Sequence, residues 1–325
     1  MTPARLRISS HASFEKIVFA TVHDVSIMRL LRQRRTTDEP TGHAMPCWRA
    51  ARIFVASGWY SPAPGEEHAR TKGWDALRAP EFHPLWYSSV ARNLRPDRTL
   101  VVNSASPVTS PLVEHGGIEW MHLGSNAGHS QDAVGRYSGW LLSVIYSLIE
   151  FLNSSYDYYI YVEQDVLLRS PTGRDMRRLL VEHCGEGLMF GGTHGKAQPL
   201  QQSLFVIHRS RAERFLTRLV MITAGDRQLS PEWKFLIASS KLPRAFATLP
   251  PRLLQRIVRL LPRRFWGYRD LPFSGGRSRP IPDDGFAYIQ HATHDELQGF
   301  LGPDDLASLR HEARPVCDRN TDNAI

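Results

Sequence analysis

The sequence predicts an α/β protein with a mostly parallel central sheet flanked by helices. The prediction rests on two segments in which a helix pattern is followed by a strand pattern. Residues 83–94 place apolar side chains at helical spacing and, after Pro96, lead into the strand pattern of residues 98–103. Residues 139–152 repeat apolar residues at helical intervals and precede residues 158–162, which are aromatic and β-branched. Helices that feed strands in this way are typical of βαβ units, which build parallel sheets.

The first part of the chain predicts two short buried strands and a long irregular segment. The strands cover residues 16–23 and 51–56, whereas residues 57–84 are rich in Gly, Pro, His and Trp without a steady period. Residues 117–123 form another strand. Small residues follow it at 124–129, where the backbone can approach a ligand closely.

The second half of the chain continues with alternating helix and strand patterns. In order, these are a helix at 175–182, paired strands at 188–195 and 202–208, a helix at 211–222, a helix that begins after Ser230, a basic amphipathic helix at 249–264 and a strand at 286–290. With 325 residues and 42% hydrophobic content, the chain can bury a large core. We expect one domain over residues 1–305 and a polar tail over residues 306–325.

Two acids follow the strand at 158–162 directly. Glu163 and Asp165 are two residues apart, so on an extended chain both carboxylates point to the same side. Carboxylate oxygens at this spacing suit Mg²⁺ or Mn²⁺, which bind one or two protein carboxylates beside a diphosphate. A structural alternative is that either acid caps the following turn or pairs with Arg169.

The order of apolar helix, Tyr156-Asp157-Tyr158, strand, Glu163-Gln164-Asp165 and an aliphatic pair resembles the metal motif of GT-A-type glycosyltransferases. That family writes the motif Asp-x-Asp, so Glu163 is a departure. The resemblance is strongest over residues 101–210. It implies a GT-A-like, Rossmann-like sheet with a donor half at about 14–170 and a smaller acceptor half at about 171–305. It also implies a nucleotide-diphosphate sugar donor, with Asp165 as the more direct metal ligand.

The resemblance also implies further site residues. Similar enzymes hold the nucleotide or sugar with a loop of the Asn-x-Gly type and a following arginine. The matching candidates here are Asn126, Gly128, His129 and Arg136. A late histidine completes the metal site in many members; His291 fits best, with His294 second. Each has a structural alternative, because glycines also permit tight turns and a lone histidine is more often a polar loop residue.

The same reasoning gives further nucleotide-binding and catalytic candidates. His23 and Asp24 end the first predicted strand, where ligands gather in α/β sheets, so they are candidate nucleotide contacts; the alternative is the start of a solvated loop. Inverting transferases need a carboxylate base, and Glu232 lies at a helix start after the predicted acceptor strands. A helix N-terminus favours an acid for structural reasons as well. Other residues predicted near substrate are the alternative bases Asp283 and Asp284 and the acceptor-side residues His194 and Gln202.

Charge and composition restrict the partners and the compartment. The net charge of +8 favours anionic partners. The three cysteines have no paired spacing, and the N-terminus shows no signal peptide, so we expect a cytoplasmic protein. The helix at 249–264 either rests on an anionic membrane surface at the inner face or packs on the domain.

The leading functional hypothesis is transfer of a sugar to a hydroxyl of a glycan or lipid-linked acceptor, with Mn²⁺ or Mg²⁺ as cofactor. A nucleotidyltransferase of similar sheet architecture is one alternative, although residues 22–27 lack the expected glycine-rich, basic loop. A non-catalytic polyanion-binding protein is another. Nucleic acid is not an expected partner, because the tyrosines lie inside a strand that ends in acids rather than on an exposed basic module.

Overall fold

The computed structural model describes most of the chain beyond residue 47. The described residues are 48–63, 75–129, 133, 135–171, 173–191, 200–260, 262–276, 286–293 and 295–301. The predicted strand at 16–23 lies outside them. So do the candidate residues His23, Asp24, His194, Asp283, Asp284 and His294. The predicted division into donor and acceptor halves stays a prediction.

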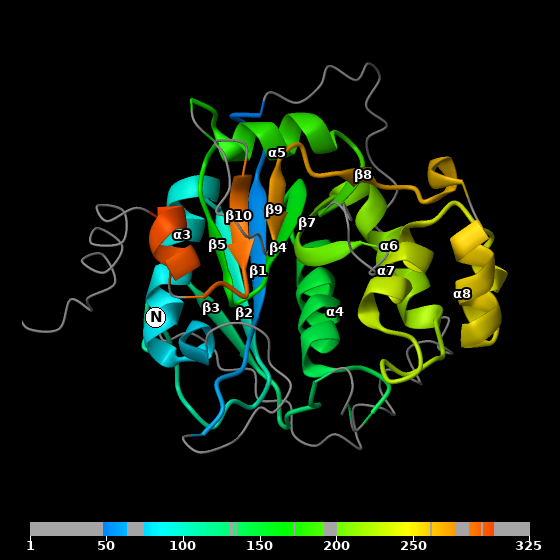
Figure 1. The fold of residues 1–325 in the computed structure, drawn as a ribbon, viewed down its shortest axis with the longest axis horizontal. Coiled ribbons are helices and arrows are strands. Elements are labelled where there is room, and N and C mark those ends of the chain that lie inside the picture. The colour runs from blue at the N-terminus through cyan, green and yellow to red at the C-terminus, as the bar shows by residue number, and fades with distance from the viewer. Residues whose placement is uncertain are drawn as a thin grey trace, which may run out of the picture.

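A seven-stranded sheet forms the centre of the molecule (Figure 1). Its order is β3 (Glu119–His122), β2 (Arg98–Asn103), β1 (Ile53–Trp59), β4 (Tyr158–Val162), β7 (Gln201–His208), β6 (Leu188–Gly191) and β8 (Arg269–Asp270). β1 pairs in parallel with β2 and β4, and β2 with β3, whereas β7 is antiparallel to both its neighbours. The predicted class of an α/β protein with a mostly parallel sheet flanked by helices is therefore confirmed.

A second, three-stranded sheet brings the end of the described chain to the acidic motif. It contains β5 (Val166–Leu168), β10 (Phe286–Gln290) and β9 (Ser274–Gly276). β10 is antiparallel to β5, with Gln290 opposite Val166. The residues that end β10 consequently lie beside the turn that connects β4 to β5.

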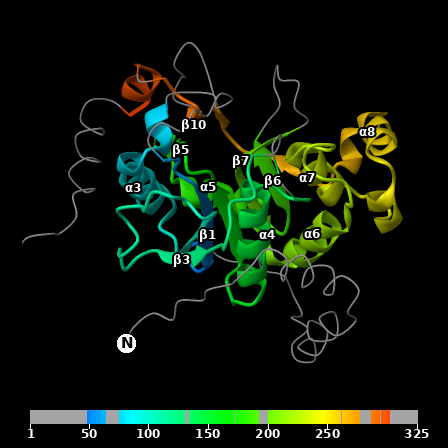
Figure 2. The same cartoon turned by 90° about the horizontal axis from the view of Figure 1, so that it is seen from below.

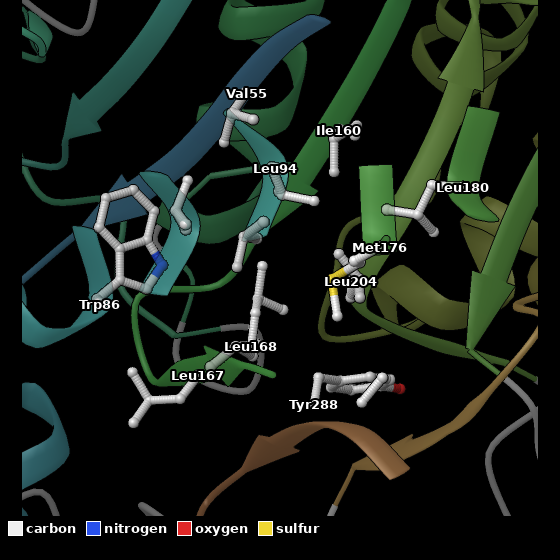
Figure 3. Packing of buried hydrophobic residues seen from close by; sticks show 14 of the residues in the cluster. Val55, Trp86, Leu94, Ile160, Leu167, Leu168, Met176, Leu180, Leu204 and Tyr288 are labelled. Atoms are coloured by element: carbon white, nitrogen blue, oxygen red, sulfur yellow. The ribbon is translucent and has the colours of Figure 1, made fainter. Parts of the chain in front are cut away.

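Helices cover both faces of the sheet. α3 (His83–Leu94) and α5 (Met176–Cys184) pack in one apolar cluster, which Figure 3 shows between α3, β4, β5 and β10. α4 (Gly139–Leu152), α6 (Arg209–Met221), α7 (Pro231–Ser239) and α8 (Pro251–Leu260) contribute to the other cluster. Figure 2 shows α7 and α8 at one end of the molecule and α3 at the opposite end. Within the described part of the chain, no helix is both long enough and apolar enough to cross a bilayer.

The alternation of side chains along β4 connects the sheet to α4. Tyr159 and Tyr161 are buried in the α4 cluster, where their hydroxyls meet Ser147 at 2.8 Å and Ser143 at 2.7 Å. A buried phenol needs such a partner, and serines four apart on a helix lie on one face to supply it. Gly58 of β1 allows this close approach, because a Cβ there would lie 2.7 Å from the Ser143 hydroxyl.

Helices and strands with strong periodicity have the predicted bounds. α3, α4, β2, β4 and β10 match the residues expected for them. β1 extends to Trp59, three residues beyond its predicted end. The basic helix is shorter than the predicted 249–264, because Pro250 and Pro251 stand at its beginning and Pro262 follows its end.

His83 is a fully buried histidine at the start of α3. Its ring stacks on Trp59 at 4.2 Å and on Trp86 at 5.0 Å between ring centroids, and Nδ1 lies 2.6 Å from the Ser110 hydroxyl. Burial lowers its pKa from 6.5 to about 3, because an apolar environment disfavours the imidazolium.

The stability of the protein is expected to fall as pH drops from about 6.5 towards 3. In this window the unfolded chain binds a proton at His83 that the folded chain does not bind, which costs about 1.4 kcal/mol per pH unit. Urea unfolding at several pH values measures it. His83→Phe keeps the aromatic stack without the titration, so its stability relative to wild type should rise as pH falls. A pH-independent difference would contradict the assignment.

Candidate active site

The acidic motif forms a turn at the carboxyl end of β4. The Val166 N–H donates to the Glu163 carbonyl at 3.1 Å, and the Glu163 N–H donates to Ser203 of β7 at 2.9 Å. The middle residue, Gln164, makes two hydrogen bonds with the Tyr60 backbone, at 2.7 and 2.9 Å, just beyond the end of β1. The expectation of an extended chain through both acids is therefore corrected: a turn places them, and it lies where β1 and β4 end side by side.

Asp165 is the centre of a buried charge cluster. One carboxylate oxygen, Oδ2, accepts from Arg78 Nη2 at 3.1 Å and lies 2.8 Å from His291 Nδ1. Burial by itself would raise the pKa of Asp165, but the hydrogen bond and charge of His291, together with the charge of Arg78, bring that pKa below its ordinary value. Asp165 is therefore ionised, and it lies beside the Arg78 guanidinium and the His291 ring.

Glu163 lies in the same cluster, but its pKa is shifted in the opposite direction to that of Asp165. The Gln290 side-chain amide donates to its carboxylate. Burial, followed by the charges of Asp165 and Glu232, raises the pKa of Glu163 well above its ordinary value, and Arg78 only partly opposes this shift. The structure thus brings Glu163, Asp165, His291 and Glu232 into one electrostatic neighbourhood.

His291 reaches Asp165 through an unusual backbone conformation. It directly follows β10 and has a φ of 54°, which few residues other than glycine adopt. The pairing of β10 with β5 sets its position, because Gln290 lies opposite the residue that follows Asp165. His291 therefore contacts Asp165, one of the two acids, and its role as a metal ligand stays a prediction.

Glu232 lies in the first turn of α7, directly after Pro231. Ser230 occupies the predicted N-cap position, yet its side chain makes no capping hydrogen bond. The helix N-terminus favours a carboxylate there, and the effect of Glu232 on the Glu163 pKa shows that this carboxylate is close to the acidic turn. Its role as a base stays a prediction.

Residues 126–128, in the loop after β3, form a hydrogen-bonded turn. The Asn126 side-chain oxygen accepts from the Gly128 N–H at 2.9 Å, and the Gly128 carbonyl accepts from Gly139 at the start of α4. Gly128 has a φ of 77°, so the turn itself needs a glycine. Asn126 and His129 are exposed. Their contact with a nucleotide, and that of Gly128, stays a prediction.

Arg136 has a structural role that the sequence did not indicate. Its guanidinium donates to the Val220 carbonyl at 2.7 Å and to the Ile222 carbonyl at 3.0 Å. These carbonyls belong to the last turn and the cap of α6, where a cation is favoured by the helix dipole. Contact between Arg136 and a phosphate stays a prediction.

Three polar residues of the cluster were not predicted from the sequence. Arg78 belongs to a short 3₁₀ helix (Asp75–Arg78) within a stretch without period, so no sequence signal marks it. Gln290 could have been found as the last residue of the strand that delivers His291. Gln164 lies between the two predicted acids. Arg169, the predicted alternative partner of the acids, instead donates to the Phe300 carbonyl, and Arg78 takes that place.

The donor set fits a divalent cation in its chemistry. Among the described residues, no group of three or more His, Cys, Asp or Glu side chains is arranged to hold a metal ion by itself. Nucleotide sites need fewer, because Mg²⁺ or Mn²⁺ there takes one or two carboxylates and completes its shell with phosphate and water. Asp165 already holds the Arg78 cation, and a cation near Glu163 would offset the burial and the neighbouring negative charges that raise the pKa of Glu163.

The comparisons with known proteins give a distant structural likeness. No family model matches the sequence, and the search of curated proteins finds no match. Among solved structures, the crystal structure of S. aureus TarS 1–349 is similar with a TM-score of 0.36 and 12% sequence identity. The match covers 58% of this chain and 54% of that chain, so it spans about half of each.

Proposed function

We propose that this protein transfers a sugar from a nucleotide-diphosphate sugar to a hydroxyl acceptor. The observation that carries the proposal is the buried acidic turn between the ends of β1 and β4, where Asp165 holds Arg78 and His291. In open α/β sheets, ligands bind beyond the carboxyl ends of strands, at the point where the strand order reverses. β1 and β4 flank that point here, because β2 and β3 continue to the other side of β1.

The charges of the site suit a diphosphate leaving group. Asp165 and His291, with Glu163 beside them, would hold Mn²⁺ or Mg²⁺, and Arg78 lies close enough to add a second positive charge. When bound, the metal ion would neutralise charge that accumulates on the diphosphate. The resemblance of Glu163-Gln164-Asp165 to the GT-A motif supports the same assignment.

Glu232 is the proposed base for an inverting reaction. A carboxylate in this position would accept the proton of the attacking hydroxyl, and its electrostatic proximity to Glu163 supports a place beside the donor. The proposed acceptor is a hydroxyl of a glycan or a lipid-linked sugar.

Calorimetry with UDP, GDP and CDP tests the donor class and the metal together. We expect one of the three to bind, with at least tenfold higher affinity in Mn²⁺ than in EDTA, because Asp165 would hold the ion and the ion would supply positive charge for the diphosphate. The matching nucleotide sugars should then be turned over. Glu232→Gln should keep the metal-dependent binding and lose turnover. Equal affinity in Mn²⁺ and EDTA would overturn the metal role, and no binding at all would overturn the donor class.

A further inference from the structure

Helix α8 is attached to the protein through one narrow face. Leu254 and Val258, four residues apart, are buried in the cluster that also contains α6 and α7. Residues four apart lie on the same side of a helix, so this pair marks the inner face. The predicted alternative of packing on the domain therefore holds for these two residues.

The outer face of α8 combines arginines with exposed leucines. Arg252, Arg256 and Arg259 are all exposed and are spaced to form one stripe. Leu253 and Leu260, seven residues apart and also on one side, are 46% and 83% exposed. The segment after Pro262 adds exposed charged and aromatic side chains at Arg263, Arg264 and Phe265. We call the exposed residues among 252–265 the α8 surface.

The charged side chains of the α8 surface are all positive. Between Glu232 and Asp270 the sequence contains no acidic residue. Within the described part of the chain, the salt bridges include Arg263 with Asp270 but none to the three arginines of the α8 stripe. Arg259 instead lies over the Trp233 ring, 5.0 Å from its centroid.

The position of α8 leaves this surface at the edge of the molecule. Figures 1 and 2 both show α8 at one end, with α6 and α7 between it and the central sheet. A helix placed in this way can lie against a flat partner without displacing the rest of the protein.

We infer that the α8 surface docks on an anionic lipid membrane. Exposed leucines beside a stripe of arginines match the two parts of a membrane interface, since apolar side chains enter the acyl boundary while arginines meet acidic headgroups. A second copy of the chain would bring like charges together. A nucleic acid would pair with the arginines but would leave Leu253 and Leu260 in water, so a lipid surface explains both features. The inference does not depend on sugar transfer.

Vesicle co-sedimentation of the full chain tests the inference. Wild type should bind phosphatidylcholine vesicles that contain 30% phosphatidylglycerol at least tenfold more strongly than pure phosphatidylcholine vesicles, and less strongly as salt rises. The combined variant Arg252→Gln, Arg256→Gln and Arg259→Gln should lose at least tenfold in partitioning. The variant Leu253→Gln and Leu260→Gln should also lose binding, although its charge is unchanged.

A charge-matched variant separates local recognition from overall charge. Arg92→Gln, Arg174→Gln and Arg214→Gln remove three exposed arginines from other parts of the chain and should bind like wild type. The inference fails if both triple variants lose the same affinity, or if wild type does not bind the anionic vesicles. It also fails if the leucine variant binds like wild type, because the surface would then recognise charge alone, as in contact with a nucleic acid. Circular dichroism establishes that each variant is folded.

Discussion

Asp165→Asn is expected to abolish the effect of Mn²⁺ on nucleotide binding and to lower donor turnover by at least about a hundredfold. Asparagine keeps the size of the side chain but loses the charge that attracts Arg78, His291 and a divalent cation to one oxygen. Because Asp165 is buried, water screens little of its charge. Removing that charge therefore weakens the attraction of Arg78 and of a divalent cation to this side chain. Calorimetry with the nucleotide that binds wild type, in Mn²⁺ and in EDTA, measures the first effect, and turnover of its sugar measures the second.

Asp175→Asn is the matched control for this substitution. Asp175 also pairs with an arginine, Arg95, but it lies at the N-cap of α5 and is partly exposed. Asparagine caps a helix about as well as aspartate, so the control should keep its fold and its metal-dependent binding. If the two variants bind nucleotide and Mn²⁺ alike, Asp165 is not a metal ligand and the proposed site is wrong. Thermal unfolding of both variants distinguishes a lost ligand from a lost fold.

Lys234→Met is expected to lower the free energy of unfolding by about 3–5 kcal/mol. Lys234 and Asp226 are both fully buried, and their charged atoms lie 2.6 Å apart. Asp226 also accepts a hydrogen bond from the Ser138 N–H at the start of α4, so the pair connects α7 to α4. Burial lowers the pKa of Lys234 while Asp226 raises it. Removing the lysine leaves a buried carboxylate without its counter-charge, and urea unfolding at neutral pH measures the cost.

Two companion variants show whether the effect comes from the unpaired charge. The double variant Lys234→Met and Asp226→Asn removes both charges and should recover part of the loss. Arg178→Met breaks the exposed pair with Glu182 and should cost no more than about 1 kcal/mol. Equal costs for Lys234→Met and Arg178→Met would show that the buried pair contributes no more than a surface pair.

Local sequence patterns predicted four elements accurately. α3 and α4 have the expected bounds because apolar side chains repeat at helical spacing, and β2 and β4 have them because each is a short run rich in strand-forming residues. The acidic motif was also found from a single segment, since two carboxylates two residues apart follow an aromatic strand and the whole order resembles a known family motif. Boundaries were less accurate where prolines limited the element, as in α8.

The sequence by itself determined that this chain forms an α/β protein with a central sheet and that Glu163 and Asp165 follow one of its strands. The resemblance pointed to His291 as a partner of those acids, but only the tertiary structure decided how the contacts form. Arg78 reaches Asp165 from an irregular stretch, His291 arrives through the pairing of β10 with β5, and Arg136 donates to carbonyls at the end of α6. The physical reason is that periodicity records which face of a segment is buried. Contacts between residues far apart in the chain depend on strand pairing and packing, which no local pattern contains.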